Sequence, residues 1–463
     1  MEGLAISEVS VKSLEFSGRI DAEYYRPEML QYERAVQEKT SIKLGDVANF
    51  LIGPFGSSFT TDNYTDDKVY RYIRGKDVKS MMLMDNDNVY MPEDDYTRLK
   101  RYALHENDIL VSVVGTLGNS AIVSTQNLPA IFSCKSTVVR PFGANPKYLT
   151  VYLNSHFGNK LLVRKERGVI QAGLNLDDLK DLPVFLPTEG FQSRIAASFD
   201  ESLQSLSDSK SAQVEAECVL LDALGLSDWT PPEPLAYAAK ASEALAAGRL
   251  DARFFAPRIQ ALLDILSSDG RTISDVAKPR REKFRPERHV LFDYIEISDM
   301  DGAGATGSTR LVAAEAPSRA TWHVRPGDII TSSVRPIRRL SAQIMPQQAG
   351  FVCSSGFVVV DPQDIAPEVL LTYLRLPVIC ELLDLYASAS MYPSITDANI
   401  FNLPMPELPD AVASQIVAHV QNARAAKARA AALLDAAKRA VEIAIEDSEA
   451  TALAHLATVE GAG

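Results

Sequence analysis

The side chains with the clearest chemistry in this sequence are clusters of lysine and arginine between short β-rich runs. The largest cluster, KPRREKFRPERH, occupies residues 278–289, and a second, RPIRR, occupies residues 335–339. Ammonium and guanidinium groups contact phosphates, and Arg, Asn, Gln, Ser and Thr read base edges. One cluster alone is typical of a solvated surface, but similar clusters in both halves favour nucleic-acid binding. The first half carries Arg71, Arg74 and Lys76 beside Tyr70 and Tyr72, and Lys160, Arg164, Lys165 and Arg167 at the end of a predicted helix.

Signatures of catalysis and metal binding are absent from the sequence. There is no phosphate-binding GxxxxGK[ST] loop, no HExxH and no GxSxG elbow, and GTLG at residues 115–118 favours a turn between β runs. The histidines lack metal-ligand spacing, and acidic pairs such as Asp177 and Asp178 are typical of turns and helix caps. The four cysteines lie far apart without a CxxC, which predicts buried thiols in a reducing cytoplasm rather than a zinc site or disulfide framework.

Composition is that of a cytoplasmic globular protein. Of 463 residues, 46% are hydrophobic and 23% charged, enough for more than one core. No apolar run approaches about 18 residues, and the N-terminus lacks a basic-then-apolar signal pattern. The net charge of −13 argues against nucleic-acid binding when taken alone. Local clusters can oppose the net charge, so the placement of the basic residues decides.

The elements that must position these clusters occur twice. RIDAEYYRP at residues 19–27 recurs as RLDARFFAP at residues 249–257, an offset of 249 − 19 = 230 residues in a chain of 463. Self-similarity at about half the length predicts a tandem duplication. The later landmarks follow in the same order: LGDVA (44–48) and ISDVA (273–277), NDILVS (107–112) and GDIITS (327–332), SCKS (133–136) and CSSG (353–356), LPV (182–184) and LPM (403–405), and SRI (193–195) and SQI (414–416).

Each copy predicts a compact α+β domain. A short helix is expected around Pro27–Glu38, followed by β-rich runs separated by Gly, Pro, Asn and Asp. One helix from about Lys147 to Lys165 should interrupt the strands, with its copy at about Pro367–Leu385. An Ala-rich helical stretch to about Ala247 should lead into the second copy.

A long amphipathic helix is predicted at the end of each copy. The first runs from Glu189 to about Leu226 with apolar spacings near the coiled-coil period, and would span about 50 Å. The second runs from about Asp410 to Asp447, and residues from 450 onward should form a frayed tail. The apolar seams comprise Phe191, Ile195, Phe199, Leu203 and Leu206, continued by Val214, Leu221 and Leu224, and in the second helix Val412, Ile416, Val420, Leu434 and Val441.

The chain therefore divides into residues 1–188 (first globular domain with its N-terminal segment), 189–230 (first long helix), 231–270 (linker and repeated lead-in), 271–408 (second globular domain) and 409–463 (second long helix and tail). PPEP at residues 231–234 marks the boundary between the halves. Each helix must bury its apolar stripe, and the other helix is the simplest partner. The fold class is α+β, with two tandem globular domains separated by two long antiparallel, coiled-coil-like helices.

These residues and their order resemble the specificity subunit of type I restriction–modification systems. The resemblance covers essentially the whole chain, and it is carried by RIDAEYYRP (19–27), IGPFGSSF (52–59), YIR (72–74), DIL (108–110) and the run 179–187 before a long helix. One of these motifs is not repeated: the GPFGSS loop (53–58) has no clear copy after Val276–Ala277, where the basic cluster begins instead. Any DNA-facing role of that loop is therefore carried over to the first domain only.

The resemblance implies two target-recognition domains, each reading one half of a split, asymmetric site in double-stranded DNA, with the helices as a spacer. It implies a chain that catalyses nothing and has no cofactor of its own. Modification subunits, typically two, would bind the helical region and methylate adenine from S-adenosylmethionine. Restriction subunits would add ATP-dependent translocation and cleavage, with magnesium on the partner subunits.

The expected DNA-facing residues are polar and basic side chains of the turns. In the first domain they are Ser57, Ser58, Tyr72, Arg74, Lys76, Ser112, Thr116, Lys135 and Gln171, and in the second Arg280, Arg281, Lys283, Arg285, Ser333, Arg335, Arg338, Ser355 and Tyr392. Two other functions are open at this point. A paired-domain scaffold that grips proteins would suit the acidic net charge, and an enzyme with unrecognised chemistry would turn over alone.

Overall fold

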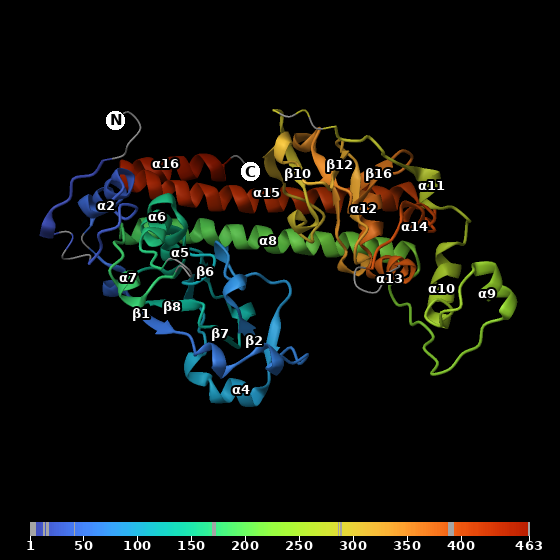
Figure 1. Cartoon of the computed structure of the whole chain (residues 1–463), viewed down its shortest axis with the longest axis horizontal. Helices are drawn as coiled ribbons and strands as arrows, with labels where there is room; N and C mark the ends of the chain where they lie inside the picture. Colours follow the sequence, from blue (N-terminus) through green and yellow to red (C-terminus); the bar gives the residue numbers. More distant parts are fainter. Residues whose placement is uncertain are drawn as a thin grey trace. The chain divides into compact units, whose positions relative to one another are not determined.

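The computed structural model describes residues 6–12, 14, 18–40, 42–168, 173–285, 287, 289–387 and 393–461. The chain divides into two compact units (Figure 1). Unit 1 consists of Met1–Leu206 and Lys427–Gly463, and unit 2 of Ser207–Ala426. The division passes through both long helices, and the finer domain boundaries given above stay predictions.

Unit 1 contains two small sheets. The five-stranded sheet has the order β1-β8-β5-β6-β3, and the three-stranded sheet has the order β4-β2-β7. β2 pairs in parallel with β7 and antiparallel with β4. Buried strands such as Ile109–Ser112 read as short apolar runs because both of their faces are covered. The strands are β1 (Ala48–Ile52), β2 (Tyr70–Ile73), β3 (Met81–Met82), β4 (Val89–Met91), β5 (Ile109–Ser112), β6 (Ser120–Ile122), β7 (Ala130–Phe132) and β8 (Ser136–Pro141).

Unit 2 repeats this topology. Its first sheet, β9-β16-β13-β14, corresponds to β1-β8-β5-β6, and its second, β11-β10-β15-β12, adds one strand to the pattern of β4-β2-β7. β10 pairs in parallel with β15 and antiparallel with β11, as β2 does with β7 and β4. The predicted duplication is therefore confirmed. The strands are β9 (Ala277–Pro279), β10 (Leu291–Ile295), β11 (Thr309–Val312), β12 (Ala320–His323), β13 (Ile329–Ser332), β14 (Ser341–Gln343), β15 (Val352–Ser354) and β16 (Phe357–Pro362).

The helices of the two units also correspond. α2 (Pro27–Lys39) confirms the predicted first helix, and α10 (Pro257–Leu266) is its copy. One short helix precedes the first strand of each unit, α3 (Leu44–Val47) in unit 1 and α11 (Ile273–Val276) in unit 2. Another precedes each long helix, α7 (Leu176–Lys180) in unit 1 and α14 (Asp397–Phe401) in unit 2.

The single helix predicted inside each copy is wrong. Each copy has two helices, α5 (Pro146–Asn154) with α6 (His156–Arg164), and α12 (Pro367–Arg375) with α13 (Pro377–Tyr386). In unit 1 the side chain of Ser155 caps the second helix by accepting from the Gly158 amide. In unit 2 Pro377 begins the second helix, because proline has no amide proton to continue the first.

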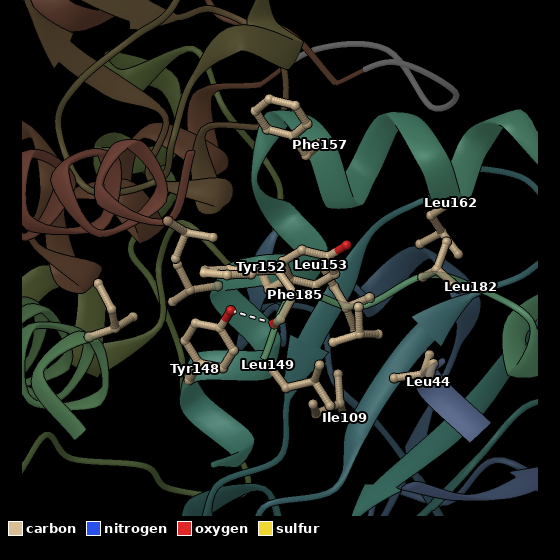
Figure 2. Packing of buried hydrophobic residues seen from close by; sticks show 14 of the residues in the cluster. Leu44, Ile109, Tyr148, Leu149, Tyr152, Leu153, Phe157, Leu162, Leu182 and Phe185 are labelled. Atoms are coloured by element: carbon tan, nitrogen blue, oxygen red, sulfur yellow. Dashed lines mark hydrogen bonds between the residues drawn. The ribbon is translucent and has the colours of Figure 1, made fainter. Parts of the chain in front are cut away.

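Buried tyrosines fasten these helices to the following chain segment. Tyr148 on α5 donates to the carbonyl oxygen of Phe185 at 2.7 Å (Figure 2). Tyr152, on the same helix, donates to the carbonyl oxygen of Pro183, also at 2.7 Å. In unit 2 Tyr373 donates to the carbonyl oxygen of Pro404 in the same way. A buried phenol requires such a partner. Burial raises the pKa of the three phenols, so they stay neutral donors.

The long helices are α8 (Glu189–Ala223) and α15 (Asp410–Glu446). Within unit 1, the buried Phe191, Ile195 and Phe199 share a core with residues 436–445 of α15, and Glu201 pairs with Arg429 at 2.5 Å. Within unit 2, Ser209 donates to the Ala423 carbonyl oxygen at 2.7 Å. The helices are antiparallel in both units, as predicted. Of the predicted seam residues of α15, Ile416, Val420 and Val441 are buried, and Val412 and Leu434 are half-buried. The remaining two of α8, Leu203 and Leu206, are also half-buried.

The predicted continuation of the α8 seam through Val214 is wrong, since that side chain is 59% exposed. Of the other predicted residues, Leu224 is buried and Leu221 half-buried, and the remaining buried positions of this part of α8 are Ser209, Ala212, Ala216 and Leu220, at spacings of three and four residues. The prediction considered only large apolar residues and therefore missed these small serine and alanine side chains, which let two helices approach closely.

The predicted frayed tail is also wrong. Residues Glu449–Glu460 form α16, whose first turn is capped by Ser448, which accepts from the Thr451 amide. Ala452 and Leu456, four residues apart, are fully buried in the unit 1 core. These two positions on one helix face hold α16 against the rest of unit 1.

The cysteines differ in exposure. Cys353 and Cys380 are buried, as predicted, and burial raises the pKa of Cys380 to about 11. Cys134 is half-buried and Cys218 is exposed, so the prediction of buried thiols is wrong for Cys218. Cys218 lies on α8 two residues from each of the buried Ala216 and Leu220, and so faces away from them. Within the described ranges, no helix is long and apolar enough to cross a membrane.

Candidate nucleic-acid interface

The predicted residues of unit 1 gather around one turn, Ser133-Cys134-Lys135, between β7 and β8. The amide of Ser133 donates to the carbonyl oxygen of Ile73, the last residue of β2, at 2.9 Å. The amide of Val113, directly after β5, donates to the Lys135 carbonyl oxygen at 2.9 Å. β1 ends opposite the first residues of β8. The segments that follow β1, β2 and β5 therefore meet at this turn.

Two glycines permit this close approach. A Cβ at residue 53 would lie 2.5 Å from the Ser133 carbonyl oxygen, and one at residue 75 would lie 2.6 Å from the Lys135 Cβ. Real Cβ atoms do not come so near, so any larger residue would push the segments apart. The IGPFGSS and YIRGK segments quoted above owe their glycines to this packing.

The polar side chains around the turn differ in their freedom to meet a ligand. Ser57, Lys76, Thr116 and Lys135 are exposed, and Ser58 is half-buried. In the part of the chain that the structure describes, no carboxylate pairs with Lys135. Lys76 pairs with Asp87 at 2.9 Å, and this contact holds the pKa of the Asp87 carboxyl below its ordinary value. Among the described residues of this edge, Lys135 is therefore an exposed lysine without a carboxylate partner.

Three other predicted residues of unit 1 have structural contacts. Arg74 forms two 2.9 Å hydrogen bonds to the buried Asp77. Tyr72 is buried against Phe59, with ring centroids 4.7 Å apart, and burial raises the pKa of its phenol to about 12. Ser112 is fully buried at the end of β5. Gln171 lies outside the described residues.

Phe55 also lies at this edge. It belongs to the IGPFGSSF motif but was not among the predicted DNA-facing residues. It is 83% exposed, although it lies between the buried Pro54 and a short 3-10 turn, η1 (Gly56–Ser58). The loop is held by the 2.8 Å hydrogen bond from the Ser58 amide to the Phe55 carbonyl oxygen, and by Arg98, which donates to the Ser58 carbonyl oxygen at 2.8 Å. An aromatic ring held out by an ordered loop is available for contact with a ligand.

Two of the four basic residues at the end of α6, Arg164 and Arg167, have structural contacts, which corrects their place among the candidate phosphate contacts. Arg164 is buried, donating to Glu33 at 2.9 Å and to the Tyr24 carbonyl oxygen at 2.6 Å. Arg167 forms two hydrogen bonds to Asp178, at 2.8 and 2.9 Å. Arg71 is likewise buried and donates to the Met84 carbonyl oxygen.

Unit 2 builds the same junction with different side chains. Around the β15–β16 turn, the amide and hydroxyl of the half-buried Ser333 donate to the Gly356 carbonyl oxygen at 2.8 and 2.9 Å. Gly356 therefore occupies the position of Lys135, whose carbonyl oxygen accepts from Val113 in the same way, and the exposed Ser355 occupies that of Cys134. After β10, Glu296 occupies the place that Arg74 has after β2, and its backbone amide donates to Asp299 at 2.7 Å. The two units therefore share the backbone arrangement at this junction but differ in the charge of the side chains around it.

The basic residues of unit 2 come from two other segments. Lys283, Arg285 and Arg338 are exposed, and among the described residues none of them has a carboxylate partner. Arg281 is exposed and pairs with Asp397 at 3.2 Å. The half-buried Arg335 has a left-handed backbone with φ of 51°, held by its amide donating to Pro393. Tyr392 lies outside the described residues.

Arg280 has a structural contact that the sequence did not reveal. Its guanidinium pairs with the buried Asp328 at 2.7 Å and with Asp361 at 2.9 Å. The corresponding buried Asp108 of unit 1 pairs with Arg140 from β8, at 2.6 Å. Loss of DNA binding on replacing Arg280 would therefore report on folding as well as on contact.

One segment of this chain matches a known protein family. Residues 37–216 match the family model described as the type I restriction modification DNA specificity domain. Over this segment, which is less than half of the chain, the resemblance to type I specificity subunits is confirmed. In the described part of the chain, no group of three or more His, Cys, Asp or Glu side chains is placed to hold a metal ion.

Individual relatives are distant. The type I restriction enzyme EcoAI specificity subunit of Escherichia coli is 25% identical over 169 residues, which span 35% of this chain and 28% of that protein. The S subunit of the type I restriction-modification system of M. genitalium covers 86% of this chain and 94% of its own, with 12% identity and a TM-score of 0.40. The HsdS subunit from Thermoanaerobacter tengcongensis covers 88% and 95%, with 18% identity and a TM-score of 0.28.

Proposed function

We propose that this chain is the non-catalytic DNA-specificity subunit of a type I restriction–modification complex in the cytoplasm. Each unit would read one half of a bipartite, asymmetric site in double-stranded DNA. The observation that carries this proposal is that the two units share one strand topology while the side chains at equivalent turns differ. Lys135 in unit 1 corresponds to Gly356 in unit 2, and Arg74 corresponds to Glu296.

The two units differ in the exposed side chains of their turns, which are the positions that would read base edges. Strands, buried tyrosines and turn glycines set the frame, and the exposed side chains of the turns supply hydrogen-bond donors, acceptors and charge. Two frames of one shape with different polar turns suit two different short sequences. A scaffold that held two copies of one protein would gain nothing from this divergence.

Unit 1 would present Lys135, Thr116, Ser57 and the ring of Phe55 to its half-site. The lysine would contact a phosphate, and the ring would pack against a base or a thymine methyl group. Unit 2 would use Arg338, Lys283 and Arg285 for the corresponding contacts. Net negative charge elsewhere on the chain would limit binding to other duplexes.

Partner subunits would supply the chemistry. DNA methyltransferase subunits, two per chain, would carry S-adenosylmethionine, and restriction subunits would carry ATP and magnesium. α8 and α15 would set the separation of the half-sites and contribute to docking. The sequence signatures support this division, since those that bind nucleotides or activate nucleophiles are absent from the chain.

Selection from random duplexes tests the proposal directly. The chain, assembled with its methyltransferase subunits, should enrich two short fixed sequences around a fixed gap. Exchanging residues 271–408 for the same region of another specificity subunit should change one fixed sequence and leave the other. Enrichment of no common sequence by the assembled complex would refute DNA readout.

A further inference from the structure

The turn between β13 and β14 in unit 2, residues 335–339, corresponds to the turn between β5 and β6 in unit 1, residues 115–118. We call the first the arginine turn and the second the glycine turn. One hydrogen bond of 2.8 Å closes each turn, from the amide of the last residue of the preceding strand to the carbonyl oxygen directly after the turn: Ser332 to Leu340 in unit 2, and Ser112 to Asn119 in unit 1. The two turns therefore occupy equivalent places, although the arginine turn is one residue longer.

Both ends of each turn have a left-handed backbone. In the glycine turn these ends are Gly115 and Gly118, with φ of 93° and 85°. In the arginine turn they are Arg335 and Arg339, with φ of 51° and 59°. Glycine adopts this conformation without steric cost, whereas the Cβ of an arginine makes it unfavourable. A strained backbone of this kind persists where the surroundings hold it and is common at functional sites. The two arginines therefore indicate a role for their side chains that glycine could not fill.

The side chain of Arg339 fastens the arginine turn to two helices. Its Nε donates to the carbonyl oxygen of Arg375, the last residue of α12, at 2.6 Å, and the Arg375 guanidinium donates back to the Arg339 carbonyl oxygen at 3.1 Å. Arg339 also forms an ion pair with Glu217 on the long helix α8. Burial and the neighbouring charge of Arg339 lower the pKa of Arg375, and the Glu217 carboxylate opposes this effect. Water screens the Arg339–Glu217 pair only in part, since the two side chains are 33% and 23% exposed.

Unit 1 holds its turn without charged groups. Gly118 takes the place of Arg339 and has no side chain that could reach a long helix. Its carbonyl oxygen accepts from the amide side chain of Asn159 on α6 at 3.0 Å. At the end of α5, Asn154 takes the place that Arg375 has at the end of α12. The ion pair with α8 is thus a feature of the arginine turn that the other copy does not share.

The arginine turn is fixed at both ends and exposed at its tip. At its start, the Arg335 amide donates to the carbonyl oxygen of Pro393 at 2.9 Å, and Pro336 is buried. The next two residues, Ile337 and Arg338, are exposed. The side chains able to meet DNA therefore lie between a buried proline and the anchored Arg339. Where the tip lies along α8 depends on the Arg339 contacts.

We infer that Arg339 is a positioning residue for sequence readout by unit 2, and that its ion pair with Glu217 fixes the exposed tip at one place along α8. Because α8 would set the gap between the half-sites, the same ion pair would set where the second half-site begins. The inference rests on the proposed function and deepens it. It also predicts an asymmetry, since the register of the first half-site would not depend on such a link.

Titration of labelled duplexes by the chain assembled with its methyltransferase subunits tests the inference. One duplex carries the site selected by the wild-type complex, and two others carry the same half-sites with the gap one base pair longer or shorter. Arg339→Gly removes the link but suits the left-handed backbone, so unit 2 should fold. The ratio of affinities for the selected gap and the altered gaps should fall about tenfold in this variant. The ratio against a duplex altered in the first half-site should not change.

Glu217→Gln breaks the same ion pair from the α8 side and should lower the gap ratio as Arg339→Gly does. Asp222→Asn, which removes an exposed carboxylate from α8, is the matched control and should keep the wild-type ratio. An unchanged gap ratio in Arg339→Gly, or an equal loss of affinity for all duplexes, would overturn the inference and leave the proposed function standing. A wild-type ratio in Glu217→Gln would also overturn it, because the contact with α8 would then not position the turn. Absence of any sequence preference in the wild-type complex would instead contradict the proposed function itself.

Discussion

Arg280 donates from Nε to the buried carboxylate of Asp328 at 2.7 Å, and so occupies the role that Arg140 has with Asp108 in the first unit. The arginine comes from the segment after β9 in one unit and from β8 in the other. In unit 2 the position of Arg140 is taken by Asp361, which also pairs with Arg280. The two units thus neutralise equivalent buried carboxylates, Asp108 and Asp328, with arginines that come from different segments.

Replacing Arg280 should therefore destabilise unit 2. We expect Arg280→Ala to lower the free energy of unfolding by about 3 kcal/mol at pH 7.5, since it leaves a buried carboxylate unpaired. Arg140→Ala makes the same deletion where the arginine side chain is 37% exposed, and should cost less because water reaches the pair. Denaturant unfolding of both variants measures the difference. Wild-type stability of Arg280→Ala would contradict the structural role.

The loss should shrink at lower pH. Burial raises the pKa of the Asp328 carboxyl above its ordinary value of about 3.9, and removing Arg280 raises that pKa further. A carboxyl whose pKa is higher in the folded state weakens that state as pH rises through the two values. Arg280→Ala should therefore regain stability relative to wild type between pH 7.5 and pH 5. An equal loss at both pH values would mean that Asp328 is not the affected group.

Lys135 and Arg338 should contribute to DNA affinity without contributing to stability. Each is exposed and unpaired among the described residues, so Lys135→Ala and Arg338→Ala should unfold as wild type does. If each contacts one phosphate, the slope of log affinity against log salt should fall by about 1 per variant. Lys180→Ala, which removes an exposed lysine on α7, is the control and should leave the slope unchanged. Unchanged slopes for all three variants would show that these edges do not meet phosphates.

Phe55 should act through contact rather than charge. We expect Phe55→Ala to weaken binding to the cognate duplex by about tenfold, the usual effect of losing one aromatic contact with a base, with an unchanged salt slope. Phe142→Ala is the matched control, because Phe142 is 64% exposed but follows the opposite end of β8. Titration of labelled duplex by the assembled complex provides the measurement. Equal affinity of both variants and wild type would remove Phe55 from the interface.

The long helices should set the gap between half-sites. Inserting one heptad into α8 after Leu206 and one into α15 after Ala426 keeps the seams in phase and adds about 10 Å. At about 3.4 Å per base pair, the tolerated gap should grow by about three base pairs, with both half-site sequences unchanged. A change in a half-site sequence would contradict this division of labour.

The sequence predicted the architecture well because its landmarks lie on buried elements. Asp108–Ile109–Leu110 and Asp328–Ile329–Ile330 begin equivalent central strands, so their recurrence implied a recurring fold. The helix break at Ser155 escaped prediction because apolar residues continue through it at helical spacing. α16 escaped because its two buried residues contact a core formed by distant segments.

The candidate site was less predictable because exposure and pairing are tertiary properties. Arg164 and Arg338 both read as surface cations, but Arg164 meets Tyr24, 140 residues away, and is buried. Arg280 meets Asp328 across 48 residues. Phe55 was not among the predicted DNA-facing residues, because the exposure of its ring depends on how its loop packs against the β7–β8 turn.

Methylome sequencing of cells that carry this chain with its methyltransferase subunit tests the central claim most directly. The account predicts methylated adenines in a split, asymmetric motif of two short sequences around one fixed gap. A chain with residues 271–408 exchanged should alter one of the two sequences only. A continuous or palindromic motif, or no motif from an assembled and S-adenosylmethionine-supplied complex, would contradict the account.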